Sequence, residues 1–222
     1  MLQLGDIRVS NSDYREQLIA VGKELYNRGL QTTRSGNISV RNGEQFLITK
    51  TGTNLGQLRE SDLVSVDIPP HVPISADASC ESPVHRAIYN ATDALAIVHA
   101  HPIHAIALAE IANNASILPV HNEGLAGLKR IPVVDTTVLG QDSGEEPSAI
   151  AAALAKYCSV VVRNHGAFTA AGSLSQALYK MLLLEDTCRI VFLVQSVKKG
   201  QESRPLTSPT THRTTAKWGR SR

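Results

Sequence analysis

Apolar and polar residues alternate along the first fifty residues in two distinct patterns. Residues 11–30 place apolar side chains at helical spacing, with Gly29 at the expected C-terminal end. Residues 38–40 then alternate apolar and polar, the Asn42-Gly43 pair favours a tight turn, and residues 46–49 return as a second strand. These patterns predict a helix followed by a β-hairpin.

Short strands and helices are predicted to follow one another through the rest of the chain. Apolar runs predict strands at residues 62–67, 94–99, 131–134, 160–163 and 167–170. Helical patterns fall at residues 83–90, 103–111, 147–157 and 173–197. Together they predict one layered α/β domain over residues 1–200, and the polar, basic residues 201–222 are expected to be disordered.

Composition narrows the function classes. The chain is 42% hydrophobic and 19% charged, as is usual for globular proteins, and its formal charge of +2 gives little support to nucleic-acid binding. The three cysteines show no metal-ribbon or CxxC spacing, which favours a reducing compartment. No secretory signal or 18-residue apolar run is found, so a cytoplasmic protein that does not enter a membrane is expected.

Histidines at the end of an apolar strand are the first candidate for chemistry. In VHAHPIH (98–104), strand alternation would project His99 and His101 from the same face. A catalytic zinc site needs three protein ligands, and His165, which follows another buried run, is the best third candidate. His104 could compete as a ligand, and the HxH spacing also suits an ordinary histidine pair.

Glu81 stands just before a helix that begins with proline. A carboxylate near a metal can act as ligand, base or acid, but a glutamate at this position is also favoured by the helix dipole alone. Ser79 and Cys80 precede it and would present backbone N–H groups suited to phosphate. Residues 35–37 and 51–53 are small polar segments that could line the same pocket or simply form turns.

Five ordered motifs together resemble the class II aldolase/adducin family, to which fuculose-phosphate aldolase belongs. They are SGNISVR (35–41), ITKTG (48–52), SCE with H-x3-Y (79–89), VHAHPIHA (98–105) and RNHGAF (163–168). The resemblance covers residues 14–197. It implies a three-layer α/β/α fold with a mixed, mostly antiparallel central sheet, and a homotetramer with active sites at subunit boundaries.

The resemblance also implies roles for individual residues. His99, His101 and His165 match the ligands of one zinc ion per subunit, and Glu81 matches the catalytic glutamate of the aldolases. The positions matching the substrate-phosphate pocket are Asn37, Thr51, Gly52, Ser79 and Cys80. Cys80 departs from the usual serine, although its backbone N–H is expected to remain available.

The implied reaction is the reversible cleavage of a ketose 1-phosphate into dihydroxyacetone phosphate and an aldehyde, through a metal-stabilised enediolate. The auxiliary tyrosines of the aldolases are missing: Asn122 follows His121, and no tyrosine follows Tyr179. Glu123 could substitute as the auxiliary acid, or be a loop carboxylate at an interface. Alternatives within the family are a pentulose-phosphate epimerase and a methylthioribulose-phosphate dehydratase; a non-catalytic, adducin-like interaction domain is the alternative of another class.

Overall fold

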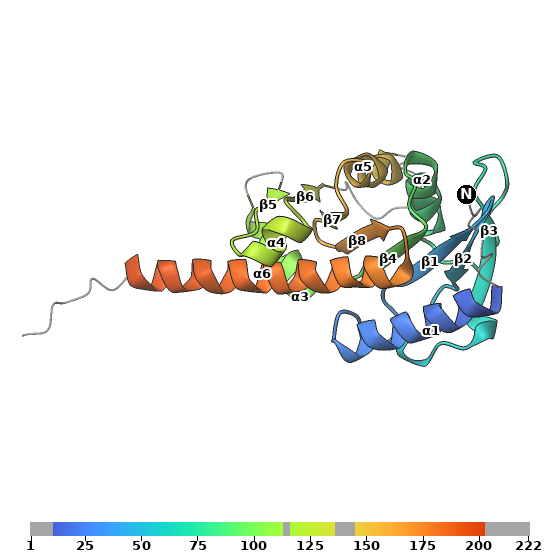
Figure 1. Ribbon diagram of the computed structural model, residues 1–222, viewed down its shortest axis with the longest axis horizontal. Coiled ribbons are helices and arrows are strands. Elements are labelled where there is room, and N and C mark those ends of the chain that lie inside the picture. Colours follow the sequence, from blue (N-terminus) through green and yellow to red (C-terminus); the bar gives the residue numbers. More distant parts are fainter. Residues whose placement is uncertain (1–10, 113–115, 136–144, 203–222) are drawn as a thin grey trace, which may run out of the picture.

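The computed structural model describes residues 11–112, 116–135 and 145–202, which form a central sheet flanked by helices (Figure 1). The helices are α1 (Asn11–Asn27), α2 (Ser82–Ala91), α3 (Ile103–Ile111), α4 (Asn122–Gly127), α5 (Glu145–Leu154) and α6 (Leu174–Glu202). The strands are β1 (Asn37–Asn42), β2 (Gln45–Thr49), β3 (Leu63–Asp67), β4 (Ala96–Ala100), β5 (Ser116–Ile117), β6 (Ile131–Val134), β7 (Ser159–Val162) and β8 (Gly166–Ala171). Two 3₁₀ turns, Leu55–Gln57 and Glu60–Asp62, connect β2 to β3.

The sheet has the strand order β3-β2-β1-β4-β8-β7-β6-β5. Neighbouring strands are antiparallel except β6 and β7, which run parallel. The mixed, mostly antiparallel sheet implied by the family resemblance is therefore confirmed. Its central strands β1, β4 and β8 come from distant parts of the sequence and carry the residues discussed below.

Alternation along the strands creates two cores, one on each face of the sheet. Val98 and Ala167 pack into a cluster with α1, α3 and α6, whereas their neighbours Ile97 and Phe168 pack into a cluster with α2 and α5. Figure 1 shows the same division, with α2 and α5 above the sheet and α1, α3 and α6 below it. This is the predicted three-layer α/β/α architecture.

Some elements differ from the sequence-based expectation. The short strand β5 and the six-residue helix α4 were not predicted, and α6 continues past residue 197 to Glu202. Helix α4 is too short to show periodicity, and tertiary contacts support it: His121 caps it at Gly124, and Lys180 of α6 donates to the carbonyl oxygen of Gly127 at 2.6 Å. Beyond Glu202, the predicted tail lies outside the described residues.

None of the helices in the described part of the chain combines the length and the apolarity needed to cross a bilayer.

Candidate active site

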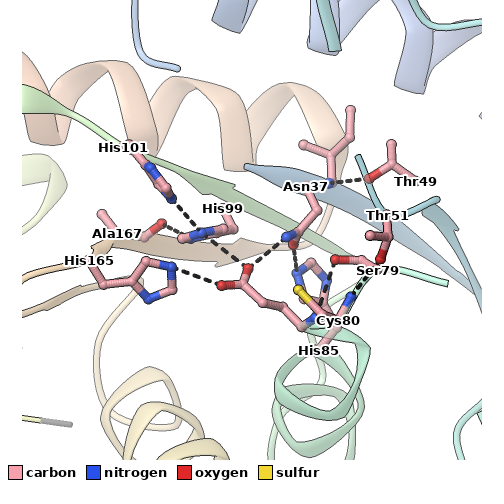
Figure 2. Close-up of polar contacts among 12 residues, drawn as sticks. Asn37, Thr49, Thr51, Ser79, Cys80, His85, His99, His101, His165 and Ala167 are labelled. Carbon is pink, nitrogen blue, oxygen red and sulfur yellow. Dashed lines mark hydrogen bonds and ion pairs between the residues drawn. The ribbon is translucent and has the colours of Figure 1, made fainter. Parts of the chain in front are cut away.

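The middle of the sheet brings the candidate residues together (Figure 2). Asn37 of β1 lies opposite His99 of β4, and His99 lies opposite Phe168 of β8. His101 follows the end of β4, and His165 lies in the turn between β7 and β8. Because antiparallel neighbours place opposite residues about 5 Å apart, three distant segments meet at this point.

Three imidazole rings form one cluster. The centroid of the His99 ring lies 5.0 Å from that of His101 and 4.8 Å from that of His165, and the other two are 5.2 Å apart. One nitrogen atom from each ring can be chosen so that all three lie within 4.8 Å of one another. The structure therefore brings together the three histidines that the sequence singled out.

Gly166 is what allows the rings to approach this closely. A Cβ atom at this position would lie 2.6 Å from the carbonyl oxygen of Ala100 and 2.7 Å from Cδ2 of His101. The preceding turn is tight, with Asn164 in the left-handed region at φ 59°. The Asn164-His165-Gly166 sequence thus turns the chain sharply and leaves room for its neighbours' side chains.

Hydrogen bonding fixes the orientation of the His99 ring. Its Nδ1 lies 3.0 Å from the carbonyl oxygen of Ala167, which can only accept, so Nδ1 carries the proton and Nε2 presents a lone pair. Burial lowers the pKa of His99 to about 3, which keeps the ring neutral at physiological pH. That Nε2 lies 3.1 Å from Nε2 of His101.

Glu81 directs its carboxylate into the cluster. It occupies the N-cap position of α2 but makes no side-chain capping bond. Instead Oε2 lies 3.1 Å from Nε2 of His99, and Oε1 lies 2.9 Å from Nε2 of His165. Burial alone would raise the pKa of Glu81, but His99, His165 and a hydrogen bond from Asn37 together hold it well below its usual range. The side chain is therefore an anion at neutral pH.

This donor set fits a bound metal ion. One nitrogen atom from each of the three imidazoles and the anionic carboxylate of Glu81 converge on one point, an arrangement that a cation would stabilise. His99 also has the hydrogen bond from its remote nitrogen to a backbone carbonyl that accompanies most metal-binding histidines. The Nδ1 atom of His165 is buried and has no hydrogen-bond partner among the described residues.

Several of the residues predicted to bind phosphate are hydrogen-bonded to other parts of the protein. The side chain of Thr51 bridges two segments, donating to the carbonyl oxygen of Ala78 at 2.9 Å and accepting from the backbone N–H of Cys80 at 3.1 Å. The N–H of Cys80, which was expected to be available for phosphate, is therefore already bonded. Gly52 takes a left-handed φ of 74° with open space around its Cα, and Ser79 Oγ accepts from the N–H of Glu81.

The possible fourth metal ligand, His104, and the possible auxiliary acid, Glu123, each bond to a residue of α6. Nδ1 of His104 lies 2.7 Å from Oε1 of Glu185, and this histidine is not part of the three-ring cluster. Glu123 of α4 accepts a hydrogen bond from the hydroxyl of Tyr179 at 3.2 Å. No contact between Glu123 and the three histidines is found among the described residues of this chain.

The sequence interpretation missed a layer of polar residues behind Glu81. His85 and Tyr89, one helical turn apart on α2, face Ser39 and Asn37 of β1 and are fully or almost fully buried. In the sequence these two residues were noted only as the H-x3-Y part of a family motif, without a role of their own. The i, i+4 spacing of two polar aromatic side chains on one face of α2 was the signal that could have identified them.

Comparisons with known proteins show which family the chain resembles over its length. Residues 16–192 match the family model described as "Class II Aldolase and Adducin N-terminal domain". The L-fuculose phosphate aldolase of Methanocaldococcus jannaschii is 30% identical over 186 residues, covering 83% of this chain and 99% of the relative. The 3-oxo-tetronate 4-phosphate decarboxylase of Haemophilus influenzae is 28% identical over 198 residues, covering 87% of this chain and 91% of the relative.

A solved structure shows the same fold. The L-fuculose-1-phosphate aldolase of Thermus thermophilus superposes with a TM-score of 0.79 at 33% identity, covering 86% of this chain and 97% of that one. The sequence match extends over most of the described residues, including all three histidines and Glu81. The chain therefore belongs to the class II aldolase and adducin N-terminal domain family.

Proposed function

We propose that this protein is a zinc-dependent aldolase that reversibly cleaves a ketose 1-phosphate into dihydroxyacetone phosphate and an aldehyde. The observation that carries this assignment is the carboxylate of Glu81, which lies 3.1 Å from His99 and 2.9 Å from His165 inside the histidine cluster. Three histidines leave one tetrahedral position of a zinc ion open for substrate, as catalytic zinc sites require. Glu81 is then free for proton transfer.

The protein's own groups have separate tasks in this reaction. A zinc ion held by His99, His101 and His165 would supply a Lewis acid for substrate oxygens and for the negative charge that develops as the C3–C4 bond breaks. Ala167 holds the His99 ring in the tautomer that presents Nε2. In the cleavage direction the auxiliary acid takes the C4 hydroxyl proton as the aldehyde forms. Glu81, an anion in the free protein, takes up a proton from water and gives it to C3 of the three-carbon product. The auxiliary acid then returns its proton to water, so that no proton is gained or lost overall.

The remaining polar residues complete the proposed site. We assign substrate-phosphate binding to Asn37, Thr51, Gly52, Ser79 and Cys80, with the Thr51–Cys80 hydrogen bond shaping the loop. We assign the auxiliary acid to Glu123, an exposed carboxylate bonded to Tyr179. An exposed acid on α4 would serve the site of a neighbouring subunit.

A homotetramer with sites at subunit boundaries is part of this proposal. A groove of 480 Å³ runs between α3, β5 and α6, and its lining includes Ile111, Leu118 and Val120, each more than half exposed. Large exposed apolar surfaces of this kind often mark protein–protein contacts. A cytoplasmic location agrees with the three cysteines, all of which are free.

The reaction is tested by incubating zinc-loaded protein with a panel of ketose 1-phosphates and measuring dihydroxyacetone phosphate with a coupled dehydrogenase. Cleavage that disappears on zinc removal and returns on zinc addition is the expected result. Equal turnover by metal-free protein would refute the assignment. Purified protein without metal, inactive on every sugar phosphate, would instead favour an adducin-like interaction domain.

Decarboxylation of a 3-oxo sugar acid phosphate is the second candidate, because the Haemophilus influenzae relative is similar over almost its whole length. Product analysis separates the two reactions: the decarboxylase releases carbon dioxide and leaves no aldehyde. The same analysis identifies an epimer or a dehydrated product, should the chain be a pentulose-phosphate epimerase or a methylthioribulose-phosphate dehydratase.

A further inference from the structure

A chain of buried hydrogen bonds leads from the core to the carboxylate of Glu81. Tyr89 Oη lies 2.7 Å from Ser39 Oγ, which lies 2.7 Å from Nδ1 of His85. On the other side of the ring, Nε2 of His85 lies 2.6 Å from Oδ1 of Asn37, whose Nδ2 donates to Oε2 of Glu81 at 2.6 Å. Figure 2 shows His85 beneath Asn37 in this arrangement.

The direction of each hydrogen bond in this chain follows from the chemistry of Glu81, its last residue. An ionised Glu81 can only accept, so the amide N–H of Asn37 must face it and the amide oxygen must face His85. Nε2 of His85 must then carry a proton, which leaves Nδ1 to accept from the Ser39 hydroxyl. Ser39 in turn is free to accept from Tyr89. Every donor in this series of hydrogen bonds therefore points towards Glu81.

The surroundings hold this arrangement in place. His85 and Ser39 are 0% exposed and Asn37 is 5% exposed, so water cannot replace a lost bond. The rings of Phe46 and Phe168 flank the imidazole at centroid distances of 6.4 and 6.1 Å. Burial lowers the pKa of His85 to about 4, which keeps it neutral and limits it to one N–H at physiological pH.

We propose that His85 is a positioning residue for Glu81, acting through the amide of Asn37. By donating from Nε2 to Oδ1, it fixes the amide so that Nδ2, and not Oδ1, faces the carboxylate. The opposite amide orientation would place an oxygen against Glu81 and repel it from the site. This role presupposes the proton transfer proposed above, because a well-placed carboxylate matters most where it moves a proton.

Two substitutions of His85 test the two ring nitrogens separately. In His85→Gln the terminal amide nitrogen lies near the position of Nε2 and can still donate to Asn37. In His85→Asn the shorter amide reaches only the Nδ1 position and leaves Asn37 without a donor. We expect roughly 10- to 100-fold lower kcat for His85→Asn with KM almost unchanged, and a much smaller loss for His85→Gln.

A merely structural role predicts a different outcome. If both variants lose kcat equally while their zinc contents and unfolding midpoints match, His85 does not act through Asn37 and the inference is wrong. Should His85→Asn fail to fold, Asn37→Asp is used in its place. This substitution keeps the shape of the side chain but replaces the donor to Glu81 with an acceptor, so it should lower kcat at least as much as expected for His85→Asn.

Long-range nitrogen–proton NMR of the wild-type imidazoles provides a readout that does not depend on the reaction. We expect the Nε2–H tautomer for His85, and the Nδ1–H tautomer would overturn the inference whether or not the protein cleaves any sugar phosphate. If the tautomer is as expected but the wild-type protein cleaves none of the ketose phosphates, the proposed reaction fails and the hydrogen-bonded arrangement stands.

Discussion

A glutamate that also contacts histidine lies at the start of α2 and another at the start of α3. The carboxylate of Glu185 points towards the backbone N–H groups of α3, whereas the carboxylate of Glu81 points away from those of α2. Glu185 reaches across from α6 and accepts from the backbone N–H groups of His104 and Ala105 at 3.2 and 3.3 Å. Glu81 stands at the start of its own helix, makes no capping bond and turns towards His99 and His165.

This difference in orientation indicates that Glu185 stabilises a helix and that Glu81 takes part in the chemistry of the site. Glu185 satisfies N–H groups that α3 leaves open and places negative charge at the positive end of the helix dipole. Glu81 forgoes the same benefit at α2, where its backbone carbonyl, and not its side chain, accepts from His85. A carboxylate held away from its most stabilising position and against two imidazoles of a histidine cluster is typical of a functional site.

The largest effect is expected from His99→Ala. Removing the ring whose Nε2 lies between Glu81 and His101 should abolish both zinc retention and cleavage, a loss of about 3 kcal/mol or more in transition-state stabilisation. Zinc content by mass spectrometry and the coupled assay measure the two losses. His104→Ala is the matched control: its ring pairs with Glu185, so the variant should keep its zinc.

Glu81→Gln should lower turnover by about 100- to 1,000-fold with zinc still bound, since the amide keeps the shape of the side chain but cannot transfer the proton. Its free energy of unfolding should also fall, because a carboxylate whose pKa the folded state holds below its usual range contributes stability at neutral pH. Steady-state kinetics and urea unfolding test both parts. Turnover close to that of the wild type would remove Glu81 from the reaction.

Gly166→Ala should weaken zinc binding by at least about tenfold, because the added Cβ would meet the Ala100 carbonyl oxygen and the His101 ring. Competition with a chelator measures the zinc affinity. Gly172→Ala, at the other end of β8, is the control, because its Cβ would meet only Gln176 Oε1 at 3.4 Å. Equal affinities in the two variants would show that the close approach at Gly166 does not constrain the site.

Stability of the metal-free protein should fall as the pH is lowered from about 6.5 to about 4. The folded state holds His85 at a pKa of about 4, whereas an unfolded histidine titrates near 6.5. Between these pKa values the unfolded state binds more protons than the folded state, so acid favours unfolding. His85 alone contributes about 3 kcal/mol to the loss of the free energy of unfolding. Urea unfolding at several pH values should show a smaller loss for His85→Gln than for the wild type.

The smallest effect on turnover is expected from Glu185→Gln, and this substitution tests the contrast between Glu185 and Glu81 directly. Neutralising this carboxylate at the start of α3 should lower the free energy of unfolding by about 1 kcal/mol and leave turnover within about twofold. The same isosteric change should therefore lower turnover strongly at Glu81 and hardly at all at Glu185. A large loss of turnover at Glu185 would show that the start of α3 also positions His101.

Much of the fold could be predicted from local patterns. The Asn42-Gly43 turn joins β1 to β2 as expected, with Gly43 at a left-handed φ of 64°. Strand alternation correctly placed His99 and His101 on the same side, although β4 ends between them. The third histidine, His165, was chosen because it follows another buried apolar run, and the family motifs agree with that choice. Elements without periodicity, such as α4, were missed because tertiary contacts hold them in place.

The sequence by itself determined the alternation of the strands, the turns that require glycine, and the presence of three histidines and a glutamate in a known order of motifs. Only the tertiary structure decided which way Glu81 turns, that His104 pairs with Glu185, and that the amide of Asn37 is held between His85 and Glu81. The physical reason is that local patterns fix backbone conformation over a few residues. A buried polar atom, by contrast, bonds to whichever partner packing brings within about 3 Å, and that partner can lie roughly 40 or more residues away.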